Sequence, residues 1–224
     1  KDQHRRHEQR DLQARAHGTG FEVVSVSVDP NNTARISAVL EGFGLVPLTG
    51  ALVTHYHQDH VGGRIMGMEI EGLARLMARA PVPVHVNALE ADGVRKITGV
   101  SESDVVRHAG GDSIALGGIT VRLLHTPGHT PGSQCFLVEE AGAAGKLVSG
   151  DTLFLGSCGR VDLPGSDPAQ MYDSLHNKLK QLPDETILYP GHFYSADPYG
   201  SMGEQKRRNP YLRAASLDDF LMFM

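Results

Sequence analysis

Residues 55–60, with the sequence HYHQDH, place three imidazole groups and one carboxylate within six residues. They directly follow an apolar run, Ala51 to Thr54, that predicts a buried strand. Zinc and similar divalent ions bind imidazole nitrogen and carboxylate oxygen, and a catalytic ion keeps an open position for water. Without a metal, so many polar groups at one strand end would be costly to bury. The segment therefore predicts a metal site that contains His55, His57, Asp59 and His60.

Three further ligand candidates lie beside glycine at the ends of apolar runs: His129 in TPGHTPG, Asp151 in SGDT and His192 in YPGH. Glycine permits the sharp turn that presents such a side chain. Seven donors exceed the four that one tetrahedral ion uses. They suit two ions that share a carboxylate and hold a water, which generates a hydroxide near neutral pH. We expect two divalent ions, zinc by preference with iron or manganese as alternatives, and catalytic roles for Asp59 and Asp151.

The other candidates are expected to be structural. Lone histidines beside apolar strands are usually hydrogen-bonded or solvated groups. The two cysteines are too few for a disulfide framework and fit a reducing compartment, with the cytoplasm expected and the mitochondrial matrix as an alternative. The residues concerned are His85, His108, His125, His176, Cys135 and Cys158.

Length and charge limit the function classes. With 224 residues and 40% hydrophobic content, the chain can bury one substantial core. A net charge of −5, a pI near 6.2 and scattered basic residues give no support to a nucleic-acid partner. No apolar run approaches the roughly 20 residues that span a bilayer, so no membrane association is expected. Residues 1–20 are charged and are expected to form a poorly ordered arm, followed by one domain over residues 21–224.

The remaining pattern predicts short strands with a few helices. Apolar residues at helical spacing predict a helix from Ile65 to Arg79, and Asp167 can cap a second helix from Pro168 to Leu182. Such a mixture suggests packed sheets with helices outside and ligands in loops at strand ends. The remaining predicted elements are strands over residues 21–28, 82–86, 119–124, 134–138, 146–149 and 186–189 and a helix over residues 33–43.

The segment THYHQDHVGG at 54–63, together with His129, Asp151 and His192, resembles the metallo-β-lactamase superfamily over about residues 21–212. This resemblance implies an α/β fold, an αβ/βα four-layer sandwich with the metals at one edge. It implies a first metal on His55, His57, His129 and Asp151, and a second on Asp59, His60, His192 and the shared Asp151. Zinc β-lactamases carry a cysteine near the Asp151 position, so antibiotic hydrolysis is not expected.

The segments GDTLF at 150–154, GSCGR at 156–160, YPGHFY at 189–194 and GEQKRRNP at 203–210 resemble the glyoxalase II branch, which includes the persulfide dioxygenases. In that branch a basic residue at Arg160 and a tyrosine at Tyr194 contact glutathione. Asp162 replaces an aromatic residue of the branch, only residues 211–224 follow the last motif, and the opening hairpin is not recognisable in residues 1–20. The resemblance therefore implies substrate-binding roles for Arg160 and Tyr194 within an incomplete glutathione site.

Three functions remain open. The leading one is a dinuclear hydrolase of a small-molecule thioester, with glutathione as a candidate carrier and Asp29 as a supporting residue near the site. The first alternative is a mononuclear iron persulfide dioxygenase that uses His55, His129 and Asp151 as a facial triad. The second is a non-catalytic metal-binding protein of the same fold. The acyl group, the oligomeric state and the compartment are not fixed by the sequence.

Overall fold

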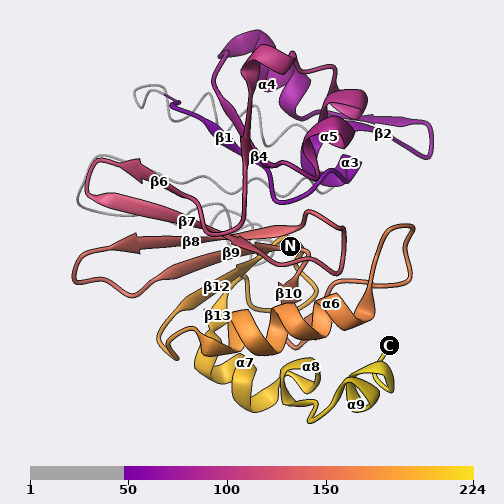
Figure 1. Cartoon of the computed structure of the whole chain (residues 1–224), viewed down its shortest axis with the longest axis vertical. Helices are drawn as coiled ribbons and strands as arrows, with labels where there is room; N and C mark the ends of the chain where they lie inside the picture. The colour runs from indigo at the N-terminus through magenta and orange to yellow at the C-terminus, as the bar shows by residue number, and fades with distance from the viewer. Residues whose placement is uncertain (1–47) are drawn as a thin grey trace, which may run out of the picture.

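The computed structural model describes residues 48–224, which form two β-sheets between outer helices (Figure 1). The smaller sheet is parallel, with strand order β1-β4-β5, and the larger is six-stranded, with order β13-β12-β9-β8-β7-β6. The small sheet comprises β1 (Ala51–Leu52), β4 (Val84–Asn87) and β5 (Val105–His108). The large sheet comprises β6 (Ser113–Leu116), β7 (Ile119–His125), β8 (Gln134–Glu140), β9 (Lys146–Gly150), β12 (Ile187–Pro190) and β13 (Gly200–Ser201), and a separate hairpin pairs β10 (Leu153–Phe154) with β11 (Ser157–Cys158).

Strand β8 shows why the large sheet has a core on both faces. Its residues alternate between two hydrophobic clusters. Phe136 packs in the cluster between the sheets, with Val121 and the partly buried Leu52, whereas Leu137 packs in the cluster under the C-terminal helices. A strand covered on both faces reads as a continuous apolar run rather than an alternating one. The segment QCFLV of this strand has that composition, and all five residues are buried.

The helix predicted from Pro168 covers the outer face of the large sheet. It begins as α6 (Pro168–Asp173) and continues as a π-helical turn (Ser174–Lys178) and a 3-10 turn (Leu179–Gln181). The Asp167 side chain accepts hydrogen bonds from the backbone N–H groups of Ala169 and Gln170, which confirms the predicted cap. The helices α7 (Met202–Arg208), α8 (Pro210–Arg213) and α9 (Leu217–Leu221) complete this layer.

Two helices cover the opposite side, over the small sheet: α4 (Leu73–Arg79) and α5 (Ala91–Thr98). Val84 and Val86 of β4 share one hydrophobic cluster with Leu73 and Val94 of these helices. The layers therefore run helix, sheet, sheet, helix, which confirms the predicted sandwich. Between α5 and β5 the chain forms a short 3-10 helix (Glu102–Asp104).

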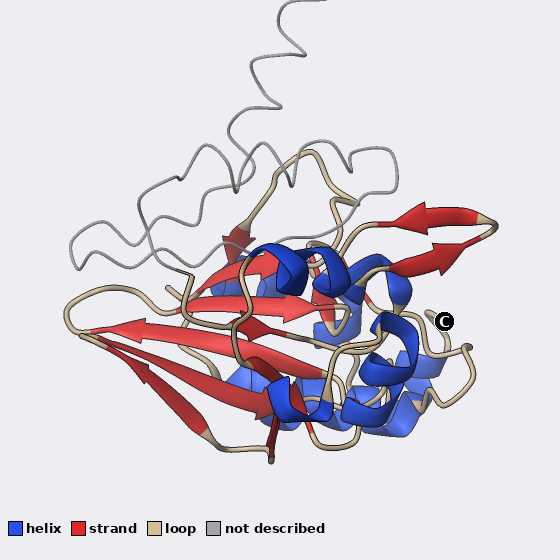
Figure 2. Ribbon diagram, turned by 90° about the horizontal axis from the view of Figure 1, so that it is seen from above, coloured by secondary structure: helices blue, strands red, loops and turns tan. Residues whose placement is uncertain are grey.

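The long helix predicted from Ile65 is wrong. Residues 63–70 instead form a hairpin of β2 (Gly63–Ile65) and β3 (Met68–Ile70), and only α4 is helical (Figure 2). The two turn residues, Met66 and Gly67, have φ angles of 49° and 86°, the left-handed conformation that tight hairpin turns require. Gly72 then packs closely on the end of the short helix at residues 58–61, since a Cβ there would lie 2.3 Å from the carbonyl oxygen of Val61. These glycines break the helical pattern.

Some expectations fall outside the described residues and stay predictions. They concern the charged arm at 1–20, the strand at 21–28, the helix at 33–43 and Asp29. Within residues 48–224, no helix has the length and apolar composition needed to cross a bilayer.

Candidate metal centre

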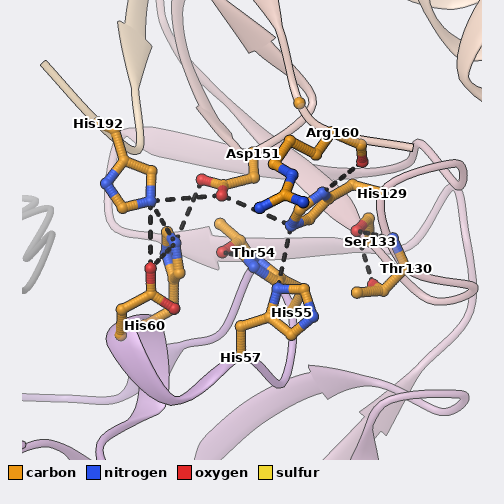
Figure 3. Close-up of polar contacts among 12 residues, drawn as sticks. Thr54, His55, His57, His60, His129, Thr130, Ser133, Asp151, Arg160 and His192 are labelled. Atoms are coloured by element: carbon orange, nitrogen blue, oxygen red, sulfur yellow. Dashed lines mark hydrogen bonds and ion pairs between the residues drawn. The ribbon is translucent and has the colours of Figure 1, made fainter. Parts of the chain in front are cut away.

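The seven predicted donors follow strands of both sheets and come together in space. Figure 3 labels all of them except Asp59. His55 and His57 lie in the loop after β1, His129 lies between β7 and β8, Asp151 directly follows β9, and His192 follows β12. Asp59 and His60 lie in a one-turn helix, α3 (Gln58–Val61), so the expectation that every donor lies in a loop is wrong for these two.

The first group of donors joins His55, His57 and His129, whose ligand atoms all lie within 4.8 Å of one another. Nε2 of His129 lies 3.0 Å from Nδ1 of His57. The second group joins Asp59, His60 and His192 at the same spacing. There Nε2 of His192 lies 3.1 Å from Nε2 of His60.

Asp151 lies between the two groups. Its Oδ2 is 3.5 Å from His129 Nε2 and 3.3 Å from His192 Nε2, and its Oδ1 is 3.2 Å from His60 Nε2. Together with His55 and His60 it forms a third set of donors within 4.8 Å. One carboxylate thus contacts both groups, the arrangement expected of a shared ligand.

The hydrogen-bonding state of the donors fits a divalent metal. Nδ1 of His129 donates to the backbone carbonyl of Arg160 at 2.8 Å, which leaves Nε2 as the ring nitrogen that faces the first group. Nε2 of His55 and Oδ1 of Asp151 are buried without a hydrogen-bond partner. Buried polar atoms are normally satisfied, and a cation would satisfy both atoms at once.

The electrostatics favour neutral imidazoles at His55 and His57 and an ionised carboxylate at Asp151. Burial lowers the pKa of His55 well below its ordinary value, and burial together with the neighbouring His129 lowers the pKa of His57 to about 4. Burial alone would raise the pKa of Asp151, but its contacts with the imidazoles of His192 and His60 hold it below its ordinary value. For His192 the burial effect is outweighed by its bonds to Asp151 and Asp59, which raise its pKa to about 10. The carboxylates of Asp59 and Asp151 thus stabilise a positive charge beside them, as a bound cation requires.

Glycine turns present two of the three donors beside glycine as expected. Gly128, which precedes His129, has a φ of 138°, and Gly150, which precedes Asp151, has a φ of 50°. A Cβ on Gly150 would also lie 2.7 Å from the Cβ of Thr54. The end of β9 therefore packs directly against the loop that carries the first histidines.

The two predicted substrate-binding residues, Arg160 and Tyr194, lie near the centre but make different contacts. The guanidinium of Arg160 pairs with Asp162 through two hydrogen bonds of 2.9 Å, and the side chains of both residues are largely exposed. The ring of Tyr194 stacks on His192, with centroids 5.4 Å apart, and meets the Phe154 ring edge-on at 5.1 Å. Tyr194 is 70% exposed and so borders the centre from the solvent side.

The histidines expected to be structural have partners other than the seven donors. Nδ1 of His85 lies 2.9 Å from Nε2 of His108, and the rings of His125 and His176 donate to the backbone carbonyls of Pro131 and Tyr211. Cys135 and Cys158 are free and buried, as expected of packing residues.

One residue close to the centre escapes sequence reasoning. Glu90 is 1% exposed and contacts the loops on both sides of the first group. In the sequence it stands among the polar residues of a helix start, and no local signal separates it from a solvated carboxylate.

Residues 27–192 match the family model of the metallo-beta-lactamase superfamily. A hydroxyacylglutathione hydrolase of Synechococcus sp. is 38% identical over 172 residues, which are 75% of this chain and 59% of that protein, so the chain spans about three fifths of this relative's length. The crystal structure of ETHE1 from Myxococcus xanthus matches with a TM-score of 0.71 and 26% identity over 96% of this chain and 86% of that one. The di-iron-bound form of TTHA1623 matches with a TM-score of 0.63 and 33% identity over 87% and 91% of the two chains. Sequence and fold agree that this chain belongs to the metallo-beta-lactamase superfamily and is similar within it to glyoxalase II.

Proposed function

We propose that the protein is a dinuclear metal-dependent hydrolase that cleaves a small-molecule thioester. The observation that carries this proposal is the contact of one carboxylate, Asp151, with two separate groups of donors. Relatives named hydroxyacylglutathione hydrolases and a di-iron-bound neighbour support it. The first ion would be held by His55, His57, His129 and Asp151, and the second by Asp59, His60, His192 and Asp151.

Two divalent ions, zinc by preference, would supply a hydroxide nucleophile near neutral pH and stabilise the negative charge that develops on the carbonyl oxygen. The chain's own residues would orient this chemistry. The Asp59 side chain is 27% exposed, more open than that of Asp151 at 10%. The Asp59 carboxylate is therefore the one placed to accept a hydrogen bond from an entering water, while Asp151 keeps the two groups of donors together.

Tyr194 and Arg160 would bind the part of the substrate that remains outside the centre. Tyr194 offers an exposed aromatic face next to His192, and Arg160 offers a cation whose guanidinium is shared with Asp162. Glutathione is one candidate carrier, since its peptide has carboxylates that a guanidinium binds well. Because Arg160 is already paired with Asp162, we expect it to bind a substrate carboxylate more weakly than an unpaired arginine would.

A second candidate is a mononuclear iron dioxygenase that oxidises a persulfide. It is favoured by one observation: His55, His129 and Asp151, two histidines and a carboxylate, are the buried donors, whereas the other four are partly exposed. Two histidines and one carboxylate on one side of an iron ion leave positions open for oxygen and substrate.

Elemental analysis of protein purified without added metal distinguishes the candidates, when combined with two assays. We expect two metal ions per chain, hydrolysis of a glutathione thioester and no oxygen uptake with glutathione persulfide. One iron per chain with rapid oxygen uptake and no thioester cleavage would establish the dioxygenase instead. A chain that binds metal but is inactive in both assays would favour the non-catalytic protein.

A further inference from the structure

Glu90 connects two loops that are far apart in the sequence. Its Oε2 accepts a hydrogen bond from the backbone N–H of Tyr56 at 2.8 Å. Its Oε1 accepts one from the hydroxyl of Thr130 at 2.9 Å and one from the backbone N–H of Gly132 at 2.7 Å. The carboxylate lies at the start of α5 and is 1% exposed.

The position of these partners is selective. Tyr56 lies between His55 and His57, and Thr130 directly follows His129, so the Glu90 carboxylate fixes both loops that bear the first group of donors. The residues of the second group lie in α3 and in the loop after β12. Within residues 48–224, Glu90 makes its hydrogen bonds to neither of these segments.

The surroundings are shaped for this carboxylate. A Cβ on Gly132 would lie 2.6 Å from Cγ of Glu90, so glycine is needed for the approach. All three partners are neutral, and burial raises the pKa of Glu90 above its ordinary value despite the bonds from Thr130, Tyr56 and Gly132. A buried carboxylate with neutral partners costs stability. Its presence is better explained by what it holds in place than by packing.

We propose that Glu90 is a positioning residue that holds His57 against His129 and thereby sets the metal affinity of the first group separately from that of the second. This inference rests on the proposed metal centre. Groups that orient metal ligands from outside the coordination sphere typically contribute 10- to 100-fold in affinity.

The substitution Glu90→Gln tests this with almost no change in volume. Whichever way the amide is turned, its NH₂ group faces a backbone N–H, that of Tyr56 or that of Gly132, and one of the two loops is released. Thr130→Val is a milder variant that removes one hydroxyl and leaves both backbone contacts.

Asn209→Asp is a matched control. Asn209 is fully buried and also makes three hydrogen bonds, to the carbonyls of Phe154 and Ser157 and from the N–H of Tyr211. This change likewise exchanges an amide and an acid at a buried site, but it acts on the β10–β11 hairpin and α8 rather than on the loops beside Glu90.

The measurement is a titration of chelator-treated protein with Zn²⁺ against a competing chromophoric chelator, with melting curves of the metal-free variants. We expect Glu90→Gln to weaken one of two binding steps about 10- to 100-fold and to leave the other within about threefold. In a His192→Ala background, which disables the second group, the remaining step should weaken by the same factor. Thr130→Val should weaken Zn²⁺ binding at the same step by a smaller factor. Asn209→Asp should lower the melting temperature without weakening Zn²⁺ binding at that step.

Equal weakening of both steps, or no change in either, would overturn the role of Glu90. The wild-type titration separately tests the proposed centre. If it shows a single ion, the dinuclear function fails, and the role of Glu90 stands only if that one affinity falls in Glu90→Gln. If it shows no ion, both proposals fail.

Discussion

The carboxylate of Asp151 packs directly against the backbone of Gly191. A Cβ atom on Gly191 would lie 2.6 Å from Oδ1 of Asp151 and 2.9 Å from the carbonyl of Gly150. The N–H of Gly191 also donates to that carbonyl at 2.9 Å. The end of β12 therefore approaches the end of β9 more closely than any residue with a side chain would allow.

Gly191→Ala should displace the Asp151 carboxylate and lower both metal content and activity by at least about tenfold, because small misplacements of reacting groups are costly. Metal analysis and thioester hydrolysis check this. Gly145→Ala is the control, since a Cβ there would lie 3.3 Å from a methyl group of Leu137 and 3.8 Å from the hydroxyl of Thr186, with no backbone atom among its nearest neighbours. Full activity of Gly191→Ala would show that the carboxylate has room to move.

Asp151→Ala should reduce the metal content below one ion per chain, whereas Asp59→Ala should retain about one. Asp151 contacts both groups of donors and its loss leaves the histidines without a shared anion, whereas the ion pairs of Asp59 within residues 48–224 are with His60 and His192 of the second group. Elemental analysis of both variants after dialysis provides the comparison. Equal metal loss in the two variants would contradict a shared role for Asp151.

The two thiols should not react with iodoacetamide in the folded protein at pH 8. Burial raises the pKa of Cys135 to about 11 and raises that of Cys158 as well, so both are protonated and shielded. A raised pKa in the folded state stabilises the protein below the ordinary value of about 9, and this contribution is lost as the pH rises from about 9 to about 11. Mass spectrometry should find no label in native protein and two labels in guanidinium; native labelling at pH 8 would show that a thiol is accessible.

Asp162→Asn should lower KM for a glutathione thioester by up to about fivefold, since an exposed ion pair in water is weak. Releasing Arg160 from its bonds to Asp162 frees a guanidinium for a substrate carboxylate. Arg160→Ala should raise KM for the same substrate more than it lowers kcat, the result of lost uniform binding. A simple thioester without the peptide is the control substrate. An equal change in KM for both substrates would separate Arg160 from recognition of the peptide.

The seven donors could be predicted because their information is local: three histidines and an aspartate stand within six residues, and the other three lie beside glycines at strand ends. The strands β7, β8 and β9 could be predicted for the same reason, since their apolar runs end in turn residues. The hairpin at 63–70 could not. Ile65, Met66, Met68 and Ile70 fit a helical face as well as a strand, and only the turn at Gly67 decides between the two.

Glu90 illustrates a different limit. Its function depends on burial against loops that lie 34 and 40 residues away in the chain. Such contacts exist only after the sheets have packed, so no pattern within a short window of sequence reveals them. The sequence likewise does not predict the helix α5 that begins there, because its apolar residues are few and the segment begins among polar residues.

The origin of the donors has a consequence for the lifetime of the folded state. His57 and His129 are 72 residues apart in the chain, and His60 and His192 are 132 apart, with one member of each pair beside the small sheet and the other beside the large one. A bound ion would therefore act as a cross-link between the halves of the sandwich, and the halves could not separate before the ion dissociates. Metal-loaded protein should consequently unfold at a rate limited by metal release, and added chelator should accelerate its unfolding in denaturant and its cleavage by proteases.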